Sequence, residues 1–155
     1  MINCGEKQVR VKATEYPLIT HGKGHRFKVI CDLDQETVTF SYPPKSDGRQ
    51  RKDDYYSFDE IFRICKYLAN HFESRSFPLA NNVEMLGNKT ERPGLGMAIR
   101  TLHQTVTRAQ AASYLGPYLE KVGAFKVIVP LPARWDLVVE PEAVIDLIKK
   151  YHKLN

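Results

Sequence analysis

The sequence changes its hydrophobic period about one third of the way along, and this change constrains the fold more than any other feature. In three segments before residue 57, apolar side chains recur at every second position, as in Phe27, Val29 and Cys31, which is typical of a strand with one buried face. After Ser57, apolar residues recur at steps of three and four, the period of an amphipathic helix. Strands followed mainly by helices predict an α+β fold.

Three segments of the first half alternate in this way: residues 8–13, 25–31 and 37–42. The last two are joined by the polar residues 32–36, a connector of hairpin length, so they are expected to pair as an antiparallel hairpin. Residues 43–52 have no periodicity and contain two prolines and a glycine, which indicates an exposed loop.

A helix is predicted over residues 57–72. Ser57 and Glu60 match a capping box, in which each side chain satisfies a backbone amide at the start of the helix. The apolar stripe of this helix includes Cys65, which is expected to pack in the core and not to act as a nucleophile. Residues 1–76 therefore form a predicted lobe of one sheet and one helix.

The second lobe is predicted over residues 77–155. It either has its own core or shares one continuous core with the first lobe. Helices are expected at 95–103 and at 107–122, where Thr107 and Gln110 match a second capping box. Pro117 follows Gly116 inside the second helix and is expected to kink or divide it. Residues 125–129 and 135–139 read as a hairpin, and a final helix starts near residue 140.

The capped helix from Thr107, which ends in a glycine and runs straight into the hairpin, resembles the recognition helix and wing of winged helix-turn-helix regulators of bacterial type. The resemblance covers about residues 78–152. It implies that the side of this helix away from the core reads DNA, with the hairpin beside the phosphate backbone. The implied reading face carries Gln110, Ser113, Pro117 and Lys121, with Tyr114 flanking it, and the further implied DNA contacts are Arg108, Lys126 and Arg134.

A second candidate site is the basic loop, Lys45, Arg49, Arg51 and Lys52, which is flanked by tyrosines. Cations beside aromatic rings can hold phosphates while the rings stack on bases. The alternative is a solvated loop whose charges are partly neutralised by neighbouring aspartates. For the winged-helix-like half, the alternative is a dimerisation or protein-docking module.

Composition favours a globular protein with a polyanionic partner. Hydrophobic residues make up 43% of the chain, and 23 basic against 18 acidic residues give a net charge of +5. The cysteines, Cys4, Cys31 and Cys65, are too widely spaced for a disulfide framework, so reduced thiols and a cytoplasmic location are expected. No membrane span or export signal is expected either.

No catalytic centre or cofactor site is expected from the motifs. Asp32, Asp34 and Glu36 alternate, but the positions where a calcium loop needs glycine and a bidentate acid hold Thr37 and Pro43. The sequence therefore predicts a DNA-binding regulator or mobile-element factor without enzymatic activity, with RNA as a possible target. A dimerisation module is the second hypothesis, and a small magnesium-dependent nuclease using Asp32 or Asp34 is the third.

Overall fold

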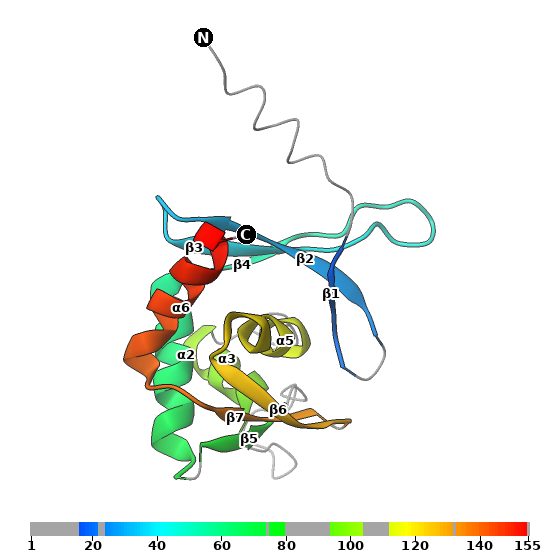
Figure 1. The fold of residues 1–155 in the computed structure, drawn as a ribbon. Helices are drawn as coiled ribbons and strands as arrows, with labels where there is room; N and C mark the ends of the chain where they lie inside the picture. Colours follow the sequence, from blue (N-terminus) through cyan, green and yellow to red (C-terminus); the bar gives the residue numbers. More distant parts are fainter. Residues whose placement is uncertain are drawn as a thin grey trace.

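The computed structural model describes residues 16–21, 24–73, 75–79, 94–103, 112–131 and 133–154. Within these ranges, four helices and two small antiparallel sheets form the predicted α+β fold (Figure 1). The strand predicted over residues 8–13 and the helix start predicted at Thr107 lie outside the described residues.

The first sheet has four strands in sequence order: β1 (Leu18–Ile19), β2 (Arg26–Asp32), β3 (Thr37–Ser41) and β4 (Asp54–Ser57). The predicted hairpin of β2 and β3 is confirmed, with Val29 opposite Phe40. Alternation places Phe27, Val38 and Phe40 on the inner face, where all three are fully buried. The side chains between these positions in each strand therefore lie on the opposite face of the sheet.

Helix α2 (Phe58–His71) begins at the predicted capping box. The Ser57 hydroxyl accepts a hydrogen bond from the Glu60 amide at 3.0 Å, and the Glu60 carboxylate accepts one from the Ser57 amide at 2.7 Å. The predicted apolar stripe is buried from Ile61 to Leu68, Cys65 included. Local sequence signals were sufficient for this helix.

The second half contributes α3 (Leu95–His103), α5 (Ala112–Val122), the hairpin β6 (Phe125–Pro130) and β7 (Ala133–Leu137), and α6 (Pro141–Leu154). Strand β5 (Ser76–Pro78), which the sequence analysis missed, pairs with β7 and gives the strand order β5-β7-β6. Phe77 in β5 lies opposite Trp135 in β7, and both rings are buried. A three-residue strand is too short to show a hydrophobic period.

Helix α5 runs through Pro117 as one helix, so the predicted division at this residue is wrong. The clash that normally excludes helical geometry before a proline involves the Cβ atom of the preceding residue. That residue is Gly116, which has no Cβ atom, so the helix continues.

Buried side chains from both halves of the chain belong to one core cluster. Figure 1 shows α5 between the four-stranded sheet above it and the three-stranded sheet below it. Helices α2 and α6 pack against one another at the side of this layered core. Across the described ranges, no helix has both the length and the apolar character that a membrane span requires.

Candidate nucleic-acid interface

Helix α5 is a core helix, and the face predicted to read DNA lies largely inside the molecule. Tyr114 is 9% exposed, and its ring contacts Phe27 of β2 and Tyr42, the residue after β3, at centroid distances of 5.2 and 4.6 Å. Pro117 is buried as well. The expectation that Tyr114 and Pro117 face outward is therefore wrong, because the first sheet covers this side of the helix.

The other DNA contacts predicted on this helix differ from these two in their exposure. Ser113 is half-buried and Lys121 is exposed. Arg108 and Gln110 lie outside the described residues. Between Ala112 and Val122, Lys121 is thus the one predicted contact that is fully accessible to a partner.

Opposite the first sheet, α5 packs so closely on β7 that only glycine fits at position 116. A Cβ atom there would lie 2.3 Å from the Trp135 ring. The carboxylate of Glu120 connects this contact to the first half of the chain. It accepts a hydrogen bond from the Trp135 indole at 2.6 Å and lies 2.5 Å from the His21 ring.

The predicted hairpin contacts lie on the outer face of the second sheet. Lys126 and Arg134 are both exposed and occupy the same face, because Lys126 pairs with Asp136, two positions from Arg134. Arg134 also donates a hydrogen bond to the Ser76 hydroxyl at 3.2 Å. Beyond Lys126 the hairpin becomes apolar, with exposed Ile128, Val129 and Leu131.

The basic loop divides into exposed cations and one cation turned inward. Lys45, Arg49 and Lys52 are exposed, although Arg49 pairs with Asp47 at 2.7 Å. Arg51 instead lies over the Tyr42 ring, with its guanidinium carbon 4.7 Å from the ring centroid. Its Nη2 atom is 3.4 Å from the Tyr114 hydroxyl, so Arg51 joins the loop to α5.

The outer face of the first sheet was not predicted as a surface, although the tyrosines beside the basic loop were. Strand register places Ile30, Thr39 and Tyr55 side by side on it. Tyr55 is 59% exposed and Ile30 is 45% exposed. The same alternation that identifies the buried positions also identifies this face, since its residues are those between them.

Positive charge lies at the end of this face that adjoins the basic loop. Lys28 pairs with Ser41 near that end, and its ammonium group is 5.1 Å from the centroid of the Tyr16 ring. Arg26 precedes it on the same face and is exposed. The opposite end holds the β2–β3 turn with its acids, so the sheet is electrostatically polarised.

No protein-family model, curated protein or solved structure matches this chain.

In the described part of the chain, the acids of the β2–β3 turn are not grouped as metal ligands. The Asp32 carboxylate accepts a hydrogen bond from the Gln35 amide at 2.9 Å and so caps the turn. Of the residues that the structure describes, no three His, Cys, Asp or Glu side chains are grouped closely enough to hold a metal ion. The His21 ring pairs with the Glu120 carboxylate.

Proposed function

We propose that the protein binds single-stranded nucleic acid, DNA or RNA, on the outer face of the first sheet and the adjoining basic loop. The observation that carries the proposal is Tyr55, a largely exposed aromatic ring on an open sheet face with cations at one end. Bases stack on exposed aromatic rings, and lysine and arginine neutralise the phosphates between them. The net charge of +5 favours association with a polyanion.

Single strands fit this geometry better than a duplex does. Duplex readers insert a helix or a β-ribbon into the major groove. Helix α5 could enter a groove only if the first sheet moved away from Tyr114, at the cost of its aromatic contacts. An open sheet face, in contrast, accepts splayed bases without any rearrangement.

We also propose that the elements from α2 to β7 form a winged-helix-type unit in which α5, the helix before the hairpin, has become part of a larger core. Three observations support this: the element order α2, β5, α3, α5, β6, β7; the strand order β5-β7-β6; and the position of the hairpin directly after α5. In this proposal the exposed Lys126 and Arg134 form a second phosphate-contact surface, on the outer face of the three-stranded sheet and away from the first sheet.

Fluorescence anisotropy with labelled dT20, rU20 and a 20-base-pair duplex tests the binding proposal. At 50 mM salt we expect a complex with the single strands, and replacing Tyr55 with alanine should weaken it about tenfold through loss of one stacked base. Tyr55→Phe keeps the ring and should bind like the original protein. Absence of a complex with all three probes would refute the proposal.

The salt dependence tests the role of the loop separately. Substituting Lys45 and Lys52 together with alanine should reduce the slope of log K against log salt by about 1.4, since each phosphate contact on a single strand contributes about 0.7. Lys150→Ala, an exposed cation on α6, is the matched control and should leave the slope nearly unchanged. If the loop and control variants change the slope equally, nucleic acid is attracted by the overall charge of the protein and the proposed role of the loop is wrong.

A specific observation favours dimerisation as a second candidate function. Strand β6 is an edge of its sheet in the described structure, with Ile128 and Val129 exposed along it and Leu131 exposed in the turn that follows. Exposed apolar edge strands readily pair with another chain. Sedimentation analysis should then show a dimer that Leu131→Ser dissociates, whereas Leu102→Ser, an exposed apolar position on α3, should have no effect.

A further inference from the structure

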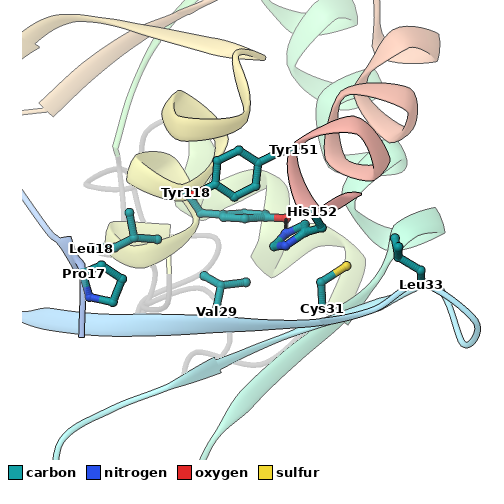
Figure 2. Close-up of a pocket in the computed structure, with 8 residues that line it drawn as sticks. All are labelled: Pro17, Leu18, Val29, Cys31, Leu33, Tyr118, Tyr151 and His152. Atoms are coloured by element: carbon teal, nitrogen blue, oxygen red, sulfur yellow. Dashed lines mark hydrogen bonds between the residues drawn. The ribbon is translucent and has the colours of Figure 1, made fainter. Parts of the chain in front are cut away.

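A pocket of about 360 Å³ lies between the inner face of β2, helix α5 and the C-terminal turn of α6 (Figure 2). Strand β1 pairs only with the first two residues of β2, and the pocket is found next to the part of β2 that β1 leaves uncovered. Figure 2 shows Val29 and Cys31 extending from β2 toward Tyr118 and His152. The volume falls within the range of small-molecule sites.

The pocket has apolar walls and one polar pair. Leu18, Val29 and Leu33 supply aliphatic surface, while the Tyr118 hydroxyl lies 2.7 Å from the Nε2 atom of His152. Among the described residues, this hydroxyl makes no second hydrogen bond. If it donates to His152, its oxygen can still accept; if it accepts, its proton can still be donated. A ligand hydroxyl, which both donates and accepts, fits either arrangement.

All the groups that line the pocket are uncharged at neutral pH. None is an aspartate, glutamate, lysine or arginine. Burial lowers the pKa of His152, so its ring is neutral. Burial, with a smaller contribution from Asp32, raises the pKa of Cys31 to about 11, so its thiol stays protonated. A charged ligand would lose its hydration here without gaining a partner of opposite charge.

We propose that this pocket binds an uncharged ring compound that carries a hydroxyl group, with the ring between Val29 and Leu18 and the hydroxyl on the Tyr118–His152 pair. The site is separate from the proposed nucleic-acid surface, which lies on the other face of the same sheet. Its occupancy therefore does not depend on that function.

The test uses ¹⁹F NMR on the full chain at pH 7 with three probes: 4-fluorophenol, fluorobenzene and 4-fluorobenzoate. We expect saturable broadening with 4-fluorophenol at concentrations on the order of a millimolar, as suits so small a ligand. Fluorobenzene lacks the hydroxyl and should bind about fivefold more weakly, the effect of one net hydrogen bond. The benzoate carries a charge and should bind at least about tenfold more weakly.

Two variants identify the pocket as the binding site. Tyr118→Phe keeps the buried ring and should reduce 4-fluorophenol binding to that of fluorobenzene, whose own binding should not change. Cys31→Phe fills the pocket and should abolish binding of both neutral probes, while Cys31→Ser should retain it. Circular dichroism verifies that each variant is folded.

Three results would overturn the proposal. The first is no saturable binding of 4-fluorophenol. The second is binding of 4-fluorobenzoate as tight as that of 4-fluorophenol. The third is unchanged 4-fluorophenol binding in the folded Tyr118→Phe variant, which would place the probe elsewhere.

Discussion

Replacing Gly116 with alanine should destabilise the fold, although alanine is the better helix former. The added Cβ atom would lie 2.3 Å from Cζ2 and 2.5 Å from Cη2 of Trp135. Non-bonded carbons prefer about 3.5–4.0 Å, so the indole must move by more than about 1 Å. Trp135 is 1% exposed, and its indole donates to Glu120 at 2.6 Å, so movement disturbs both packing and this bond.

The expected magnitude follows from three opposing contributions. Overpacking a core costs about 1–3 kcal/mol, and loss of a hydrogen bond to a charged group costs about 1.5–3 kcal/mol when it breaks fully. Alanine recovers about 0.5–1 kcal/mol of helix propensity. The free energy of unfolding should therefore fall by about 2–4 kcal/mol, which for a chain of this length lowers Tm by about 5–15 °C.

Guanidinium denaturation measures this change directly, because Trp135 is the only tryptophan in the chain and its fluorescence reports on the contact. Gly123→Ala is the control: it also replaces a glycine but meets no atom within 4 Å, and its φ of +94° should cost about 1–2 kcal/mol. In a Trp135→Phe background, followed by circular dichroism, the alanine should be better tolerated. A Gly116→Ala protein within 0.5 kcal/mol of the original would refute the reasoning.

Three further predictions concern single side chains. Ser57→Ala removes the helix cap and should cost about 1 kcal/mol in urea denaturation, whereas Ser46→Ala in the exposed loop should cost less than about 0.5 kcal/mol. Burial lowers the pKa of His152 in the folded state, so the unfolded chain takes up the proton first; stability should fall as the pH drops below about 6.5, and less steeply in His152→Phe. Arg51→Ala should lower the free energy of unfolding by about 1 kcal/mol through loss of the Tyr42 contact, whereas Lys45→Ala should leave it unchanged within about 0.5 kcal/mol.

The elements with strong local signals were predictable from the sequence. The β2–β3 hairpin follows from alternation, and α2 follows from its capping box and apolar stripe. Each of these signals lies within a short stretch of chain and needs no knowledge of the remainder. Strand β5 carries no such signal, since it exists only because β7 pairs with it.

The position of α5 could not be predicted for a different physical reason. Its periodicity correctly marks Leu115 and Tyr118 as core, but periodicity does not say how many layers cover a helix. Tyr114 has an amphipathic side chain that suits either a wet or a buried face. Only the first sheet, contributed by residues some ninety positions earlier, decides that it is buried.

The candidate site could also be predicted only in part from the sequence. The sequence identifies the basic loop, but it treats its four cations alike, whereas the structure gives Arg51 an aromatic partner in the core. The open sheet face was within reach of the alternation argument. The sequence does identify tyrosines beside the basic loop. It does not group Tyr55 with Ile30 and Thr39 on one face, because Tyr55 lies in a strand of four residues, too short to establish a period.

Because α5 lies between the two sheets, the first sheet cannot be covered until α5 has been synthesised. Phe27 and Phe40 leave the ribosome long before Tyr114 and Tyr118, the α5 rings that cover them. During that interval the first sheet presents an uncovered aromatic surface, which is the kind of surface that chaperones bind and that causes nascent chains to aggregate. Slowing elongation between residues 58 and 112 should therefore lower the soluble yield, even though the finished protein would be unchanged.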